Sequence, residues 1–235
     1  MAFVTESVWN FTKELKWLDK YLEGHNGFIA GGFAKQIFKG ERIKDLDIFF
    51  HNAKDFNAAV EWYGGSTSYD RLGEKGHEDD RIDFYYENEN VHAFRHMRGG
   101  KSIMVLELNQ KIFGSPQEIL SQFDFTIAKF AFFKHWVYNK PGPDGNPWLD
   151  ENDNDMHEEQ AALYHEKFFE HLTLNRLVID DQCLYPSSTM ERTYKFGKRG
   201  YFPCRATMIK LVQALRAMPE EEVTRFSLYL NNGLD

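Results

Sequence analysis

The sequence has few of the features of disulfide-rich, secreted or membrane-spanning proteins. Its 235 residues include only two cysteines, Cys183 and Cys204, in no spacing typical of metal ligands. So few cysteines argue against a disulfide framework and fit a reducing cytoplasm. No apolar run reaches the roughly 18 residues that a membrane-spanning helix needs. The N-terminal segment carries early charges and no long apolar run, so we expect no secretory signal.

Basic charge is also scarce. Lys and Arg total 28 against 36 Asp and Glu, which gives a net charge of -8. A general binder of duplex DNA or of an anionic membrane usually has a basic surface, so we expect neither partner. A local basic groove stays compatible with this balance. The hydrophobic content of 42% is enough for a sizeable core in one large domain, or in a domain with an appendage.

Alternating helix and strand patterns over residues 1–140 predict one α/β domain, with a mixed sheet packed by helices. We expect helices over 5–23, 33–39, 53–65 and 115–123. Asn52 and Ser115 provide N-cap signals, and Glu118 completes a capping box. Strands are expected over 27–30, 45–50, 81–86, 91–96, 102–112 and 123–133.

The pattern changes after residue 140. Three prolines, two glycines and an acidic run lie in 139–156, and such composition is typical of a linker or long loop, which we place at 141–155. Beyond it, 156–235 reads as a helical C-terminal part, with helices predicted over 156–172, 188–199, 205–218 and 219–231.

Two aspartates interrupt the apolar strand "DLDIFF". Alternate residues of a strand share a face, so the Asp45 and Asp47 carboxylates should converge on one point. Paired carboxylates repel each other unless a cation lies between them, and oxygen ligands suit a hard cation such as Mg²⁺. The alternative is an exposed pair at the end of a strand.

Gly31 and Gly32 end one strand and open a short helix. Glycines at this place let a phosphate approach the backbone, and amides at a helix N-terminus hold anions. Lys35 and Lys39 follow on that helix, where either binds phosphate or faces solvent. A metal site beside a phosphate cradle is the arrangement that nucleotidyl or phosphoryl transfer needs. An ordinary tight turn is the alternative reading of the glycines.

The whole pattern resembles the DNA polymerase beta-like nucleotidyltransferase superfamily, in the form found in phages and large viruses. In that superfamily an apolar residue precedes two small residues, a short helix, and a strand bearing D-x-D. The resemblance covers roughly residues 25–135, and its motif residues here are Ala30, Gly31, Gly32, the helix 33–39, Asp45 and Asp47.

The resemblance implies roles for these residues. Asp45 and Asp47 bind Mg²⁺ or Mn²⁺, and the amides of Gly31 and Gly32 hold phosphates of an NTP such as ATP. A third carboxylate comes from a later strand and shares a second metal. "FDFTIAKF" offers Asp124 for that place, and we expect it to lie across from the aspartate pair. Asp83 in "RIDFYY" is the rival candidate.

The most basic local stretch lies near the C-terminus. "STMERTYKFGKRGY" resembles a basic helix that follows the catalytic domain in these proteins, and we expect 192–201 to face the Asp45–Asp47 cleft. Lys195, Lys198 and Arg199 would then bind the nucleotide or an RNA backbone. The alternative is an amphipathic helix with its aromatic side chains in the core. The basic and aromatic residues of this stretch are Arg192, Tyr194, Lys195, Phe196, Lys198, Arg199, Tyr201 and Arg205.

The implied activity is transfer of a nucleoside monophosphate from an NTP to a hydroxyl group, with release of pyrophosphate. The acceptor is an RNA such as tRNA, a small molecule or a protein. One alternative is an inactive nucleotidyltransferase fold that binds a nucleotide or a partner protein. Another is a toxin-like enzyme that modifies tRNA or protein of a host.

Overall fold

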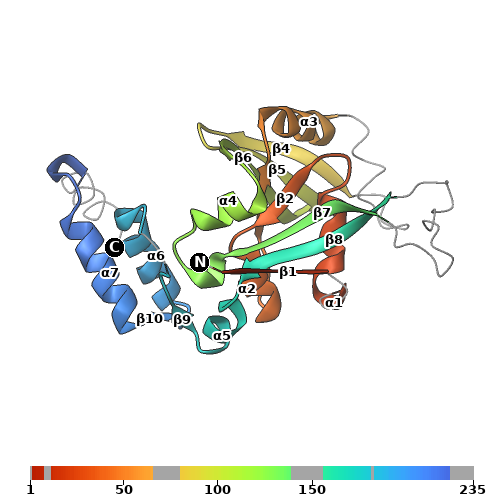
Figure 1. Cartoon of the computed structure of the whole chain (residues 1–235). Coiled ribbons are helices and arrows are strands. Elements are labelled where there is room, and N and C mark those ends of the chain that lie inside the picture. Colours follow the sequence, from red (N-terminus) through yellow and green to blue (C-terminus); the bar gives the residue numbers. More distant parts are fainter. Residues whose placement is uncertain (1, 8–11, 66–79, 139–155, 181–182, 223–235) are drawn as a thin grey trace, which may run out of the picture.

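A mixed eight-stranded sheet forms the body of the protein, with the strand order β1-β8-β7-β2-β3-β6-β5-β4 (Figure 1). The structure is a computed structural model that describes residues 2–7, 12–65, 80–138, 156–180 and 183–222. Only β3 and β6 pair in parallel, and every other neighbouring pair in this sheet is antiparallel. The strands are β1 (Phe3–Ser7), β2 (Gly27–Ala30), β3 (Asp45–Phe50), β4 (Arg81–Glu87), β5 (Val91–Arg98), β6 (Lys101–Phe113), β7 (Phe130–Tyr138) and β8 (Met156–His165).

Helices cover both faces of this sheet. Leu46, Ile48 and Phe50 of β3 are buried in one core cluster with Ala59 and Tyr63 of α3. On the opposite face, Phe28, Ala30 and Phe49 form a smaller cluster with two residues of α4. The helices up to this point are α1 (Thr12–Leu15), a 3-10 helix (Lys16–Tyr21), α2 (Phe33–Phe38), α3 (Ala53–Gly64), α4 (Pro116–Ser121) and a 3-10 helix (Thr126–Ala128).

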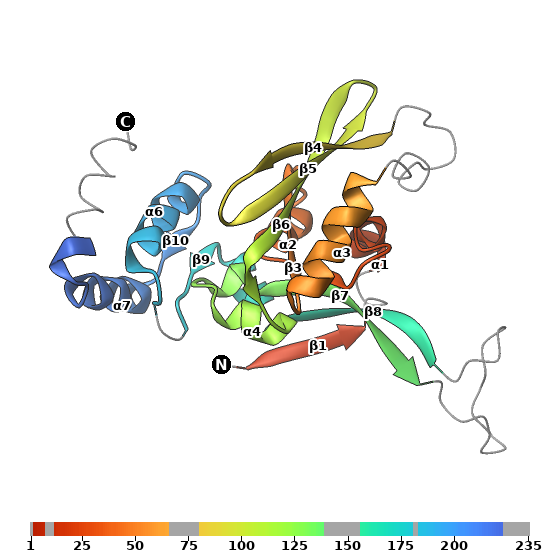
Figure 2. The same ribbon diagram turned by 90° about the horizontal axis from the view of Figure 1, so that it is seen from above.

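The C-terminal elements lie together at one end of the sheet, as both views show (Figures 1 and 2). Short strands β9 and β10 pair in parallel and connect α5 to α6 and α7. The buried Lys129 ammonium, just before β7, lies 2.8 Å from the Asp180 carboxylate and so ties this part to the sheet. The elements are α5 (Phe168–Thr173), β9 (Arg176–Leu177), α6 (Pro186–Gly197), β10 (Phe202–Pro203) and α7 (Arg205–Arg216).

The predicted fold class is confirmed, together with most elements that rest on local signals. The Asn52 side chain accepts a hydrogen bond from the Asp55 amide at the start of α3. Ser115 and Glu118 form the predicted capping box of α4. Helices α6 and α7 also form near their predicted bounds. Most of the helix predicted over 219–231, like the loop 141–155, lies outside the described residues.

Three predicted elements are wrong. The helix predicted over 5–23 gives way to β1 and to short helices over 12–21, although Leu15, Leu18 and Leu22 are buried as their spacing requires. The helix predicted over 156–172 is instead strand β8 followed by α5. Residues 161–165 of strand β8 are buried on both faces between β1 and β7, so this part of the sequence lacks the alternation that marks a half-buried strand.

The third wrong element concerns Asp124, which does not lie on a strand. Strand β7 begins only at Phe130, and a 3-10 helix precedes it. The Asp124 carboxylate accepts a hydrogen bond from the Phe125 amide, and the Thr126 amide donates to the carbonyl of Val178. These bonds hold the segment in a turn against the C-terminal part, so the apolar residues around Asp124 are not those of a strand.

Candidate active site

Strand β3 presents Asp45 and Asp47 on the face opposite the α3 core. Leu46 and Ile48 alternate with them and are fully buried. Strand β6 runs parallel to β3 and places Glu107 directly beside Asp47. Asp45 lies at the exposed start of the strand, and Asp47 is half-buried. Asp47 and Glu107 therefore form an adjacent carboxylate pair on the site face of the sheet.

The two carboxyl groups of this pair interact with each other. Burial, the nearby Glu107 and Asp45 charges, and a hydrogen bond to Glu107 raise the pKa of Asp47 from its usual 3.8 to about 7. A second hydrogen bond reaches Glu107 from the Tyr86 hydroxyl, over 2.7 Å. A carboxyl pair that retains a proton near neutral pH is a site where a cation has a strong electrostatic advantage.

The Gly31–Gly32 turn lies against the same carboxylate. Gly31 has φ +105°, a conformation that side chains rarely adopt, and a Cβ there would lie 3.4 Å from Asp47 Oδ2. Its amide donates to the Phe130 carbonyl over 3.0 Å, so it is already used within the fold. Gly32 is the N-cap of α2, and a Cβ on it would meet nothing within 4 Å. Gly31 thus sets the chain path, and Gly32 leaves open space.

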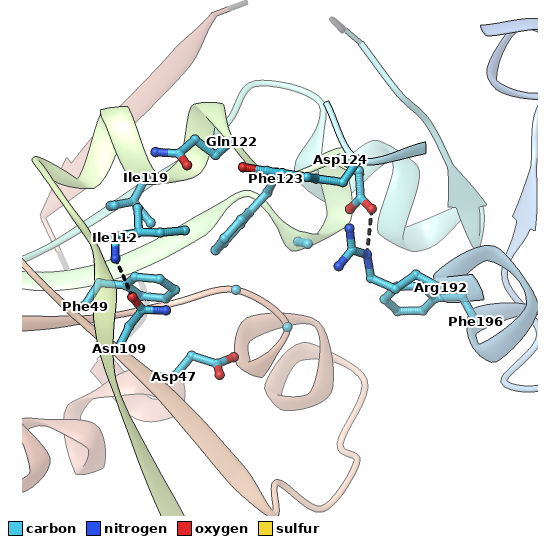
Figure 3. Close-up of a pocket in the computed structure, with 14 residues that line it drawn as sticks. Asp47, Phe49, Asn109, Ile112, Ile119, Gln122, Phe123, Asp124, Arg192 and Phe196 are labelled. Carbon is cyan, nitrogen blue, oxygen red and sulfur yellow. Dashed lines mark hydrogen bonds and ion pairs between the residues drawn. The ribbon is translucent and has the colours of Figure 1, made fainter. Parts of the chain in front are cut away.

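A cavity of about 340 Å³ opens beside these residues and is lined by both glycines and Asp47 (Figure 3). Its volume falls in the range of small-molecule sites. Most of the lining is apolar, whereas Asn109 and Gln122 add amide groups. The apolar side chains come from β3, β6, the α4 segment and α6, and they include Phe49, Ile112, Ile119, Phe123 and Phe196.

Asp124 lines this cavity but is bound to an arginine. Its carboxylate is buried and accepts a hydrogen bond of 2.7 Å from Arg192 Nε on α6. Figure 3 shows Asp124 turned towards Arg192, on the other side of the cavity from Asp47. The structure therefore brings Glu107 next to Asp47, and it places Asp124 in an ion pair that closes the cavity against the C-terminal part.

Several other predicted residues lie away from the cavity lining. The buried Lys35 ammonium lies 3.2 Å from the Glu41 carboxylate and 5.1 Å from the centroid of the Tyr201 ring, and burial lowers its pKa. Lys195 forms an ion pair with Glu191 on α6. The Lys198 ammonium lies 4.5 Å from the centroid of the Tyr194 ring.

Asp83 lies on the edge strand β4, in an ion pair with Arg81 at 3.0 Å. Arg199 follows α6, near enough to Lys35 to lower the pKa of its ammonium. Lys39 is exposed at the end of α2. Of the basic stretch, only Arg192 and Phe196 line the cavity.

Glu107 was not predicted, although its sequence carried a signal. In "IMVLELN" an acidic residue stands at an alternate position of an apolar strand, as Asp45 and Asp47 do in "DLDIFF". The decisive fact is the parallel register between β3 and β6, which joins segments about sixty residues apart.

The donor groups fit a divalent cation in their chemistry. Across the described ranges, no set of three or more His, Cys, Asp or Glu side chains is already gathered closely enough to hold a metal. Asp47 and Glu107 nevertheless lie side by side, and Asp45 lies on the same face of the sheet at the start of β3. Carboxylate oxygens are the ligands that Mg²⁺ and Mn²⁺ prefer. A cation between them would replace the proton that the pair retains.

The raised pKa of Asp47 predicts a pH dependence of stability. A carboxyl whose pKa rises on folding stabilises the protein fully below its usual 3.8, and this contribution is lost as the pH rises through about 7. With a chelator present to remove metal ions, the melting temperature of the wild type should therefore fall relative to that of Asp47→Asn as the pH rises from about 5 to about 8. Thermal melts of both proteins measure this, and an unchanged difference would contradict it.

Solved structures provide one comparison. A CCA-adding enzyme in complex with ATP matches with a TM-score of 0.55 at 14% identity, over 92% of this chain and 47% of that one. A CCA-adding enzyme with CTP matches with a TM-score of 0.54 at 16% identity, over 92% of this chain and 46% of that one. At these identities the likeness shows the fold alone, which is of the nucleotidyltransferase type. This chain spans about half the length of those enzymes.

Sequence comparisons complete the picture. No curated protein sequence matches the chain. No helix among the described residues is long and apolar enough to cross a membrane. A protein-family comparison matches residues 5–174 to the family described as "Gabija anti-defense 2 family protein". That match takes in the whole sheet from Thr5 onward, including Asp47, Glu107 and the Gly31–Gly32 turn. With most of its length covered by this match, the chain belongs to the Gabija anti-defense 2 family.

Proposed function

We propose that this protein is a metal-dependent nucleotidyltransferase. The observation that carries the proposal is the adjacent Asp47–Glu107 pair beside the Gly31–Gly32 turn, with Asp47 at the wall of a cavity of about 340 Å³. The reaction joins an acceptor hydroxyl oxygen to the α-phosphorus of an NTP. The bond from that phosphorus to the departing pyrophosphate breaks.

Asp45, Asp47 and Glu107 would hold Mg²⁺ or Mn²⁺ in this reaction. When bound, such a metal neutralises the triphosphate and lowers the pKa of the attacking hydroxyl. Glu107 takes the place that the sequence assigned to Asp124, because Asp124 is neutralised by Arg192. The open backbone at Gly32 would let a phosphate approach, and the apolar cavity wall would exclude water from the nucleotide.

The family supplies a biological setting for this chemistry. We infer that the protein is encoded by a phage and acts against a defence system of its host, as the family description suggests. Nucleotide transfer onto a host component would inactivate that component or remove what activates it. An RNA such as tRNA, a small molecule and a protein all stay candidates for the acceptor.

Two observations favour a second candidate, a binding protein without turnover. Among the described residues no complete metal-ligand set is preassembled, and Lys35 is bound to Glu41. A protein of this kind would bind an NTP or a signalling nucleotide in the cavity and keep it from the host. Nucleotide binding with no pyrophosphate release would identify this case.

The experiment that separates the two functions measures pyrophosphate. Each of the four NTPs is incubated with the protein and Mg²⁺ or Mn²⁺, with and without an extract of host cells. We expect release that depends on the metal and on the extract. Labelled NTP then shows which component of the extract takes up the nucleotide. If the protein binds an NTP tightly but releases pyrophosphate under none of these conditions, the proposed transferase activity is wrong.

Arg192 predicts a nucleotide-binding effect. Arg192→Gln removes a cation from the cavity wall and leaves the buried Asp124 carboxylate to repel a triphosphate. We expect NTP affinity to fall by about ten- to a hundredfold, which is the usual contribution of a charge-assisted contact to binding. Isothermal titration with a non-hydrolysable NTP measures this.

Lys195→Gln is the matched control for Arg192→Gln. Lys195 lies on the same helix but forms its ion pair with Glu191, away from the cavity lining. Because Lys195 does not line the cavity, this substitution should leave the NTP affinity within about twofold of that of the wild type. If Arg192→Gln and Lys195→Gln lose NTP affinity equally, the nucleotide is held by the overall positive charge of α6 and not by a contact at the cavity wall.

A further inference from the structure

Four residues stand in one row across the sheet on the face of the proposed metal site. Asp47 of β3 pairs with Glu107 of β6, and Glu107 pairs with Ala93 of β5. Ala93 pairs in turn with Tyr86 of β4. The Tyr86 hydroxyl donates a hydrogen bond of 2.7 Å to Glu107 Oε1, although β5 lies between their two strands.

A bulge in β4 puts Tyr86 into this row. The register runs Asp83 to Arg95 and Phe84 to Phe94, then shifts so that Tyr86 faces Ala93. Without the extra residue, Tyr85 would stand opposite Ala93. Bulges often re-aim side chains next to functional sites. Here the bulge exchanges one tyrosine for the next in the row that leads to Asp47.

Ala93 makes the long reach across β5 feasible. Neighbouring strands lie about 4.8 Å apart, so a side chain on β4 must cross roughly twice that distance to meet one on β6. Ala93 is fully buried, and its side chain is a single methyl group. A larger residue there would project from the same face of the sheet, between Tyr86 and Glu107.

We propose that Tyr86 is a positioning residue that holds Glu107 as a ligand for the divalent metal beside Asp47. The inference rests on the proposed function, because it needs the metal site at Asp47. Metal-ligating carboxylates are themselves held by hydrogen bonds, and those partners matter for affinity. The Tyr86 bond occupies Oε1 and fixes the side chain, so that Glu107 is already oriented towards Asp47 before a metal arrives.

Binding of Mn²⁺ alone tests the inference without reference to activity. Electron paramagnetic resonance counts free Mn²⁺ in titrations of the full chain. Tyr86→Phe keeps the ring and removes only the hydroxyl, and we expect it to weaken Mn²⁺ binding about tenfold, as is usual for such partners. Tyr85→Phe removes the same atom from the exposed neighbouring residue, and it should change the affinity by less than about twofold.

A double-mutant cycle asks whether Tyr86 acts through Glu107. In the Glu107→Gln background the hydroxyl has no carboxylate to hold, so adding Tyr86→Phe should change Mn²⁺ affinity no further. An additional loss of similar size in that background would show that Tyr86 acts by another route. It would overturn the positioning role, as would wild-type affinity in Tyr86→Phe.

Asp47→Asn separates failure of this inference from failure of the proposed function. If Asp47→Asn and Tyr86→Phe both bind Mn²⁺ as the wild type does, the metal site itself is wrong. If Asp47→Asn loses binding and Tyr86→Phe keeps it, the site stands and the role of Tyr86 falls. Loss in both, with none in Tyr85→Phe, supports the positioning role.

Discussion

Asp47→Asn is expected to abolish nucleotide transfer while the protein stays folded. Asp47 is central to the proposed site, since it borders Glu107, Asp45 and the Gly31 turn at once. A bound metal contributes several kcal/mol to stabilising the transition state, so its loss should slow pyrophosphate release by about a thousandfold or more. An asparagine keeps the size of the side chain and removes a charge that its neighbours repel.

Asp83→Asn is the matched control for this loss. Asp83 is also an acidic residue on a strand of the same sheet, but it lies on the edge strand in an ion pair with Arg81. Transfer should stay within about threefold of the wild type, because exposed ion pairs contribute little. Pyrophosphate release by both variants at saturating Mg²⁺ decides the matter, and normal release by Asp47→Asn would refute the proposed mechanism.

The local part of the site could be predicted because each step depends on neighbouring residues. Two glycines before a short helix, followed by alternating aspartates in an apolar strand, are visible within seventeen residues, Gly31–Asp47. The helix caps at Asn52 and Ser115 have the same character, since each side chain bonds an amide three residues on. Short-range geometry is enough for such features.

The remaining parts depend on contacts between distant segments. Glu107 joins the site through the register of β3 with β6, and a shift of one residue would turn it to the opposite face. Strand β8 is identified only by its two neighbours, because the continuous burial of residues 161–165 leaves a pattern that also suits a helix. The sequence alone does not reveal the register of β3 with β6 or the pairing of β8 with β1 and β7.

Asp124 illustrates a different limit. Its position after a capped helix suggested a third metal ligand, and the acidic side chain does reach the same cavity as Asp47. Its partner is Arg192, from a helix 68 residues further along the chain. A buried carboxylate needs a positive charge, and an arginine supplies it as well as a metal does. The residue type therefore could not decide between them.

Gly31→Ala should damage both stability and transfer, and this is the second large effect that we expect. Alanine at φ +105° is strained, which costs about 1–3 kcal/mol of the free energy of unfolding. To relieve that strain the turn must move, and the Asp47 carboxylate lies 3.4 Å from the new Cβ. Misplacing a catalytic group by about 1 Å lowers rates by roughly a hundredfold. Denaturant unfolding and pyrophosphate release measure the two losses.

Gly32→Ala tests the phosphate cradle without that strain. Gly32 has φ -72°, which alanine adopts readily, and its Cβ would meet no atom within 4 Å. Stability should therefore stay within about 0.5 kcal/mol of the wild type. Gly32 lines the cavity, so a methyl group there would stand where a phosphate must approach, and the KM for NTP should rise. Only the conformation at Gly31 demands glycine, so the two variants should differ in stability. Wild-type stability in Gly31→Ala would show that the turn tolerates a side chain. Unchanged kinetics in Gly32→Ala would place the phosphates elsewhere.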